Sequence, residues 1–376
     1  MAQAKDVIQH IREEDNDSYS DDSLFNIKSW GADLSFRELI QRYDDDELVK
    51  PELQRQYVWD KSEASRFIDS VLLGLPVPSI FLAQTLDERL LIIDGYQRIM
   101  TVYDFVRGIF SRDESTFNLS RSEKINSRWR GKMFLDLSDT EQRRVKNTTI
   151  HAIIFAQQQA SPDDTSLFQV FERINTSGRT LLPQEIRNCV AQGNFNELLF
   201  ELNRYPTWRM LFGLPEPDAR MRDMEAILRF FALTSKTYKA DQREKISLRR
   251  FLDLFMKSNA TLSSHELRLL SDRFTSAIDL IATKFGPFAF HNASTTDTKK
   301  FVPKFSPTIY DSTLIAADYV LCNRSYVIRA DPDEARRSLL RDDEYRVAIS
   351  KETMTKENIN KRISKACSHL FGVKYE

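Results

Sequence analysis

The sequence predicts an α+β protein in which an N-terminal α/β core precedes a mostly helical region. Two apolar, strand-like runs at 79–84 and 89–94 are separated only by the polar turn 85–88, and a helical period begins directly after them. Beyond residue 195 nearly every apolar pattern has the helical period. Phenylalanine is abundant (25 residues) and glycine is scarce (10 residues), which favours helical packing over many tight turns.

The composition is that of a globular protein without a strong overall charge. Hydrophobic residues make up 41%, charged residues make up 29%, and the formal net charge is −1. Any contact with DNA therefore has to come from a local basic patch. No apolar run approaches the ~20 residues that span a bilayer, and the first residues lack the apolar core of a signal peptide. The three cysteines are far apart and predict neither disulfides nor a metal site. We expect a cytoplasmic protein with no membrane partner.

Three regions are predicted along the chain. Residues 1–23 form a mobile acidic N-terminal segment, because the stretch 13–23 is acidic, polar and almost free of apolar side chains. Residues 24–195 form the α/β core, and residues 196–376 form the helical C-terminal region. The stretch 111–147, which is rich in Ser, Arg, Asn and Lys, is expected to be mostly loop.

Local signals predict the individual elements. Asp60 and Glu63 have the spacing of a capping box before a helix that ends near Gly74 and Pro76. The pattern after Gly95 is that of an amphipathic helix. Besides a helix-like stretch at 34–49, we expect a strand at 148–156 and helices at 163–175, 183–192, 195–203, 221–235, 249–258 and 264–285.

The junction of the strand 89–94 and the next helix carries the first candidate site, in the sequence DGYQR. The first turn of a helix offers unpaired N–H groups and a partial positive charge, which together bind phosphate. Gly95 allows a close approach of the backbone, and Arg98 adds a guanidinium that can bind phosphate oxygens in a bidentate manner. Asp94 has the chemistry to hold a metal ion or orient water. The alternative is structural: Asp94 caps the helix and Arg98 pairs with a surface carboxylate.

Two further clusters carry polar side chains. The stretch 51–60 places Gln54 and Arg55 beside aromatic residues, which suits the binding of a base or a phosphate, although Trp59 alone could simply anchor the next helix. The stretch 171–188 contains a turn with Asn175, Thr176 and Gly178, and such a turn is usually only a loop.

These clusters follow one another in a recognisable order. The patterns P-x-x-Q-R-x-Y-V-W, G-L-P-V-P, I-D-G-x-Q-R and F-x-R-I-N-T-x-G-x-x-L-x-x-Q-E-I-R-N lie between about residues 35 and 200, and R-x-x-D-x-E-x-x-L-R-F begins at Arg220. In this order and spacing the chain resembles the DUF262 family, which is similar to the N-terminal part of GmrSD-type and SspE-type phage-restriction proteins.

The resemblance implies a ParB/sulfiredoxin-like core that binds nucleotide phosphates at its glycine turn. The family signature D-G-Q-Q-R falls on Asp94, Gly95, Gln97 and Arg98, with Tyr96 in place of the first glutamine. A tyrosine cannot act as an amide, so hydrolysis is less firmly implied than binding. The resemblance implies a nucleoside triphosphate of unspecified base, with Mg²⁺, as ligand. The implied catalytic residues are Asp94, Gln97 and Arg98, and the implied nucleotide-binding residues are Gln54, Arg55, Gly95, Tyr96, Asn175, Thr176 and Gly178.

A nuclease motif is not found in the sequence. Members of the family that cut DNA often carry a C-terminal HNH domain, which needs clustered His and Asn to hold a metal. The five histidines of this chain are isolated from one another, and none has such a context. We therefore expect a separate effector or nuclease subunit as partner. The helical region also carries Arg222, Asp223, Glu225 and Arg229 at helical spacings, which suggests an ion-pair network.

Three functions follow, in order of preference. The first is a nucleotide-binding sensor, or a Mg²⁺-dependent NTP hydrolase, within a bacterial anti-phage or DNA-restriction system. The second is a non-enzymatic, ParB-like DNA-binding or adaptor protein that uses basic segments such as 112–132 and 143–146. The third is a nuclease acting through the DGYQR site, ranked last because a single carboxylate makes a poor metal site.

Overall fold

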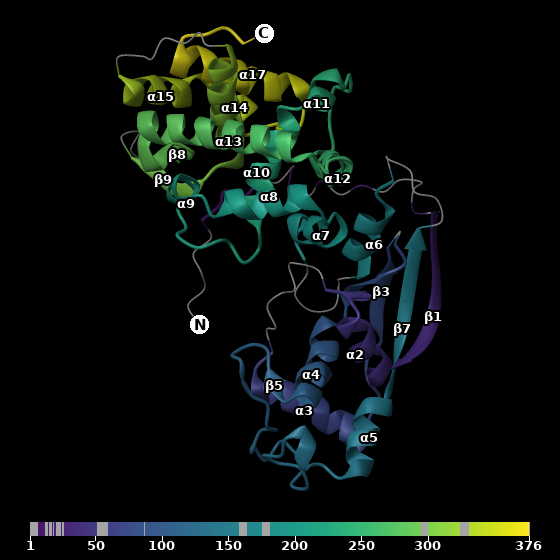
Figure 1. Cartoon of the computed structure of the whole chain (residues 1–376). Helices are drawn as coiled ribbons and strands as arrows, with labels where there is room; N and C mark the ends of the chain where they lie inside the picture. Colours follow the sequence, from purple (N-terminus) through teal and green to yellow (C-terminus); the bar gives the residue numbers. More distant parts are fainter. Residues whose placement is uncertain are drawn as a thin grey trace. The chain divides into compact units, whose positions relative to one another are not determined.

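The computed structural model describes residues 7–11, 14, 17, 19, 24, 26–50, 59–85, 87–157, 164–174, 181–294, 300–323 and 331–375 (Figure 1). A mixed sheet with helices is followed by a mainly helical region, which confirms the α+β class. Contacts between residues divide the chain into two compact units. The sheet unit comprises residues 21–181 and 188–190, and the helical unit comprises residues 1–20, 182–187 and 191–376.

The first twenty residues therefore group with the helical unit, although the whole sheet unit follows them in sequence. Much of the predicted mobile segment 1–23 lies outside the described residues. Its mobility, and the predicted division into 1–23, 24–195 and 196–376, stay predictions.

The central sheet has five strands in the order β1-β7-β3-β4-β2. β7 is antiparallel to β1 and parallel to β3, and β3 is antiparallel to β4. The strands predicted at 79–84, 89–94 and 148–156 are confirmed, whereas β1 was not predicted. The strands are β1 (Ile27–Ser35), β2 (Leu48–Val49), β3 (Ile80–Gln84), β4 (Leu90–Asp94) and β7 (Thr149–Gln157).

One face of this sheet packs on a group of helices (Figure 1). Along β7, Ile150, Ala152 and Ile154 are buried, while the alternate residues are more exposed, as the two-residue period of a strand requires. They share one apolar core with residues of the helices. The helices of this unit are α2 (Phe36–Asp44), α3 (Lys61–Leu73), α4 (Tyr96–Arg107), η3 (Phe134–Asp136), α5 (Asp139–Asn147) and α6 (Ser166–Ile174), with a small hairpin of β5 (Ile109–Phe110) and β6 (Ser115–Thr116).

Helix capping explains where two of these helices begin. The predicted capping box of α3 is confirmed, because Asp60 accepts from the N–H of Glu63 and Glu63 accepts from the N–H of Asp60. The stretch 111–147 is mostly irregular, as expected, although its last part forms α5. A second capping box, of Ser138 and Glu141, starts α5, and the S-x-x-E signal for it is present in the sequence.

Aromatic side chains form the core of the helical unit. Trp208 is fully buried and contacts the rings of Phe212, Phe274, Phe305 and Tyr310. No described helix is both long and apolar enough to cross a membrane. The elements are α7 (Pro183–Val190), which is shared between the units, α8 (Asn194–Asn203), α9 (Pro206–Phe212), α10 (Arg222–Leu233), α11 (Lys236–Ala240), α12 (Leu248–Ser258), α13 (Ser264–Phe285), η4 (Gly286–Phe288), β8 (His291–Ala293), β9 (Phe301–Phe305), α14 (Pro307–Asn323), α15 (Pro332–Arg341), α16 (Asp343–Ala348), α17 (Lys356–Ala366) and η5 (Cys367–Phe371).

Candidate functional site

The DGYQR turn joins the buried strand β4 to helix α4, as predicted. Gly95 is the residue before the helix and has a φ of +101°, a conformation that favours glycine. A Cβ at this position would lie 2.2 Å from Cγ2 of Ile80 in the neighbouring strand. The turn therefore requires glycine for two reasons, the backbone angle and the close approach of β3.

Helix α4 begins without a side-chain cap from the described residues. This contrasts with α3 and α5, whose first turns are closed by capping boxes. The structural alternative is therefore wrong in that Asp94 does not cap the helix, but it is confirmed in that Arg98 pairs with a carboxylate at the surface, that of Asp94. The start of an α-helix carries N–H groups that need acceptors from outside the helix, so the position is chemically suited to an anion.

Arg98 lies in the first turn of α4, and its side chain contacts residues at the ends of β4 and of the segment before β3. Its Nη2 forms an ion pair with Asp94 and donates to the carbonyl oxygen of Ser79 at 3.2 Å. The Arg98 side chain is 17% exposed and the Asp94 side chain is 43% exposed. Nε of Arg98 is buried and has no hydrogen-bond partner among the residues described. The guanidinium is thus held in place through one nitrogen and retains an unsatisfied donor.

Gln97 links the turn to the end of the second cluster. Its Oε1 accepts from the backbone N–H of Trp59 at 3.3 Å, and its carbonyl oxygen accepts from the hydroxyl of Thr101 at 2.7 Å. Trp59 directly follows the stretch 51–58 and packs edge-on against Phe67 of α3. The expected anchoring role of Trp59 is therefore present, and the backbone of the same residue contacts Gln97 of the turn.

Tyr96 has a different environment from its neighbours in the turn. Its residue exposure is only 5%, and it belongs to the apolar core beneath the sheet. The hypothesis of a nucleotide contact through this phenol stays a prediction. The burial favours packing as the main role of the side chain.

Five of the predicted nucleotide-binding residues cannot be placed. Gln54 and Arg55 in the second cluster, and Asn175, Thr176 and Gly178 in the third, lie outside the described residues. Of the predicted site, the structure therefore describes Asp94, Gly95, Tyr96, Gln97 and Arg98. Among the described residues, no group of three His, Cys, Asp or Glu side chains could hold a metal ion.

The predicted ion-pair residues of the helical unit are all paired: Arg222 has a local partner four residues before it, whereas the partners of Asp223, Glu225 and Arg229 lie farther away in the chain. Asp223 is fully buried and pairs with Arg209 at 2.8 Å, and Glu225 pairs with Arg187 at 2.9 Å. Sequence reasoning missed the partners, because most lie far away in the chain. The remaining pairs join Arg222 to Asp218 at 2.6 Å, Arg220 to Glu185 at 3.1 Å, Arg187 to Asp253 at 2.6 Å, and Arg229 to Glu14 at 2.7 Å and to Asp311.

Comparison with known protein families finds a match over the region that carries the motifs. Residues 36–191 match the family model of the GmrSD restriction endonuclease N-terminal domain. No curated protein and no solved structure matches the chain. The match covers the DGYQR turn and the clusters before and after it, and it confirms the resemblance predicted from the motifs. Residues 36–191 of this chain are therefore similar to the N-terminal domain of the GmrSD restriction endonuclease, a DUF262-type family.

Proposed function

We propose that this domain binds a nucleoside triphosphate at the Asp94–Arg98 turn and acts as the nucleotide-responsive component of a DNA-restriction system. The observation that carries the proposal is the state of Arg98. Its guanidinium lies at the start of α4, which no side chain of the described residues caps. It is held by a half-exposed carboxylate through one nitrogen, and its buried Nε lacks a hydrogen-bond partner among the described residues. A phosphate at the helix start would supply the missing acceptor.

The ion pair of Asp94 and Arg98 supports an exchange of partners when the nucleotide binds. Asp94 and Arg98 neutralise each other in this structure. When phosphate oxygens take over the guanidinium, the Asp94 carboxylate becomes available. Mg²⁺ bound to a triphosphate usually needs only one or two protein carboxylates besides the phosphates, so a single Asp94 suits that role better than it suits a metal-only nuclease site. The ion would neutralise phosphate charge there.

Gln97 is the candidate for orienting water at the terminal phosphate. Its amide oxygen already accepts a hydrogen bond from Trp59, which limits the directions in which the amide can point. Catalytic glutamines orient attacking water in other NTP hydrolases. In this proposal Arg98 stabilises the charge that develops on the phosphate, and the start of α4 positions it.

A DNA-binding adaptor is the second candidate, and one surface favours it. The stretch 111–147 of the sheet unit exposes several basic side chains, and the family is that of a restriction endonuclease. Exposed basic side chains can contact the phosphates of DNA whatever its base sequence. The exposed residues are Arg112, Arg121, Lys124, Arg128, Arg143 and Arg144.

Phosphate release separates these functions. The purified chain is incubated with each of the four NTPs and Mg²⁺, with and without duplex DNA, and nucleotide binding is measured by calorimetry in parallel. Nucleotide binding, with or without turnover, supports the sensor. Tight DNA binding without any nucleotide binding favours the adaptor. Nicking of DNA without nucleotide favours a nuclease at the DGYQR turn and would overturn the proposal.

A further inference from the structure

The described residues of the first twenty lie along the helical unit, with a β-bridge at Ile8 and backbone turns from Ile11 to Glu14 and from Glu14 to Asp17. We call residues 7–11, 14, 17 and 19 the N-terminal segment. Its backbone pairs with the end of β9: the carbonyl of Val7 accepts from the N–H of Phe305 at 2.7 Å, and the N–H of Gln9 donates to the carbonyl of Phe305 at 2.8 Å. This is strand addition, a common mode of peptide recognition. Ile8 and Ile11 are each only 8% exposed and supply apolar anchors.

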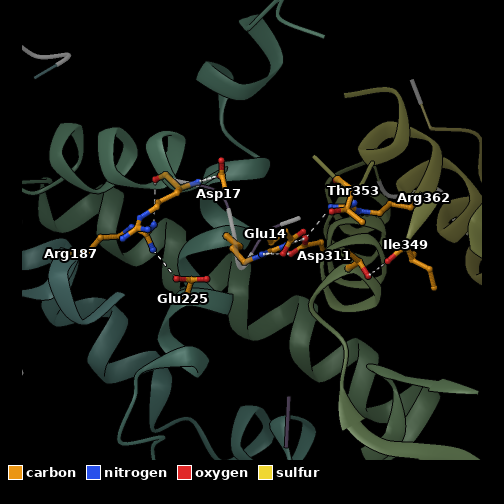
Figure 2. Close-up of polar contacts among 11 residues, drawn as sticks. Glu14, Asp17, Arg187, Glu225, Asp311, Ile349, Thr353 and Arg362 are labelled. Atoms are coloured by element: carbon orange, nitrogen blue, oxygen red, sulfur yellow. Dashed lines mark hydrogen bonds and ion pairs between the residues drawn. The ribbon is translucent and has the colours of Figure 1, made fainter. Parts of the chain in front are cut away.

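Glu14 supplies the central charged contact of the segment. Its carboxylate accepts from Nη1 of Arg229 at 2.7 Å, and both side chains are at most 10% exposed (Figure 2). Arg229 and Arg362 also share the carboxylate of Asp311, which is fully buried. Without Glu14, two buried guanidinium groups would face one carboxylate. The position therefore selects an acidic side chain, because an unpaired buried charge is strongly unfavourable.

Two more polar contacts extend the recognition. The carboxylate of Asp17, which is labelled in Figure 2, accepts from the backbone N–H of Arg249 at 2.8 Å. It also accepts from the hydroxyl of Ser247 at 3.3 Å, and so it caps helix α12. The hydroxyl of Tyr19 donates to Asp253 at 2.7 Å. Five side chains of the segment thus repeat at intervals of two or three residues, in the pattern I-x-x-I-x-x-E-x-x-D-x-Y.

Arginines line the surface under the segment: Arg229 pairs with Glu14 of the segment, whereas Arg187, Arg220 and Arg222 pair with carboxylates of the helical unit itself. A cavity of about 200 Å³ lies beside the segment within the helical unit. The body of the unit lines it with five arginines and one glutamate, whereas Glu14 and Asp17 of the segment supply the other carboxylates. The five arginines are Arg187, Arg220, Arg222, Arg229 and Arg249.

We propose that this groove is a docking site for an acidic peptide segment of a partner protein, and that the N-terminal segment is its intramolecular occupant. The partner segment carries two aliphatic residues three positions apart, followed by carboxylates at the positions of Glu14 and Asp17. It adds to β9, fills the pockets of Ile8 and Ile11, and neutralises Arg229. The proposal does not depend on nucleotide binding by the sheet unit.

A labelled peptide tests the proposal on the full chain. The peptide has the sequence of residues 5–20, KDVIQHIREEDNDSYS, and its binding is followed by fluorescence polarisation. The double variant Ile8→Asp, Ile11→Asp releases the segment, because two carboxylates cannot occupy the apolar pockets. We expect this variant to bind the peptide at least tenfold more tightly than the unaltered chain, whose own segment competes at high effective concentration.

Changes in the peptide give the matched controls. A Glu14→Lys peptide and a scrambled peptide of the same composition should each bind the released variant at least tenfold more weakly. A peptide that keeps only the five anchor residues, with serine elsewhere, should bind within about fivefold of the native peptide. If the anchor-only peptide fails, the groove accepts only this chain's own segment and the partner assignment is overturned.

Other results would also overturn the proposal. These are equal binding to the unaltered and released chains, equal binding of the scrambled peptide, or no binding to a released chain that keeps its circular dichroism spectrum. If the double variant does not fold, Glu14→Gln provides a milder release and should raise peptide affinity a few fold, and no change would count against the groove. A concentration-dependent dimer of the unaltered chain, measured by light scattering, would assign the groove to segment exchange between two copies instead.

Discussion

Arg98 of the sheet unit and Arg229 of the helical unit show two different uses of the same side chain. Arg98 is 17% exposed, and its partners lie 4 and 19 residues away in sequence. Arg229 is 4% exposed, and its partners lie 82 and 215 residues away. Burial acts to lower the pKa of Arg229, but Asp311 and Glu14 outweigh it, so its pKa is raised well above the ordinary value.

The difference separates a structural charge from one available to a ligand. Arg229 is neutralised by carboxylates that are themselves buried, so a small ligand cannot reach it, and a peptide would reach it only by displacing Glu14 together with the N-terminal segment. Arg98 is held by a carboxylate that water already reaches, so exchanging that carboxylate for a phosphate costs little. The predictions below test this contrast, from the largest expected effect to the smallest.

Removing Asp311 should have the largest effect. Asp311→Ala leaves Arg229 and Arg362 buried without their shared carboxylate. We expect the helical unit to lose about 3–5 kcal/mol of unfolding free energy, the range for breaking a buried ion pair. Hydrogen exchange of the α14 and α17 amides reports the local stability of this unit. The matched control is Asp94→Ala, for which we expect a loss of at most about 1 kcal/mol in the sheet unit. Similar losses for both variants would remove the contrast.

Removing Arg98 should affect ligand binding instead of stability. Arg98→Ala should weaken nucleotide binding by roughly 1.5–3 kcal/mol, or about 10- to 150-fold, the range for a charge-assisted hydrogen bond. Calorimetry with the preferred NTP measures this directly. Arg107→Ala is the matched control, because Arg107 lies at the other end of α4 in an exposed ion pair with Asp44. Unchanged affinity in a folded Arg98→Ala variant would contradict a phosphate site at this turn.

The same contrast decides what could be predicted from the sequence. The strand, glycine and helix around Asp94–Arg98 are encoded locally, within residues 90–107, so the apolar periodicity and one glycine were enough to place them. The capping box of Asp60 and Glu63 is equally local. The partners of Arg187 and Arg229 could not be predicted in this way, because only the folded helical unit brings Asp253, Asp311 and Glu14 to them. In the sequence, Glu14 belonged to an acidic stretch with no sign of burial.

Tyr96 tests, within the turn itself, whether a side chain contacts the ligand or only supports the fold. If the family amide at this position orients water, Tyr96→Gln should raise the rate of hydrolysis. The burial of Tyr96 in the core predicts otherwise: a rate within about threefold of the original and a loss of about 1–3 kcal/mol of stability, because an amide would replace an aromatic ring in an apolar site. Steady-state phosphate release and thermal unfolding of the two proteins measure both quantities. A faster enzyme of unchanged stability would place the side chain at the substrate.

The smallest expected effect concerns a buried histidine of the helical unit. His291 is 8% exposed, and its Nδ1 is buried with no hydrogen-bond partner among the described residues. Burial and, secondarily, the charge of Arg336 lower its pKa below the ordinary 6.5. The unfolded chain therefore binds a proton more readily than the folded chain. By linkage, the stability that neutral His291 confers is complete above pH 6.5 and is lost as the pH falls through the lower folded pKa.

The effect of His291 can be separated from that of the carboxylates. Burial acts to raise the pKa of Glu14, but Arg229 overrides it, so the net pKa lies below 4.5 and the contribution of Glu14 is lost only in more acidic solution. Between pH 7 and pH 5 we expect the melting temperature of the helical unit to fall for the unaltered chain and to fall less for His291→Gln. Differential scanning calorimetry of both proteins across this range measures the difference. Parallel curves would show that His291 keeps its ordinary pKa in the fold, and that its burial, unlike that of Arg229, does not change its protonation.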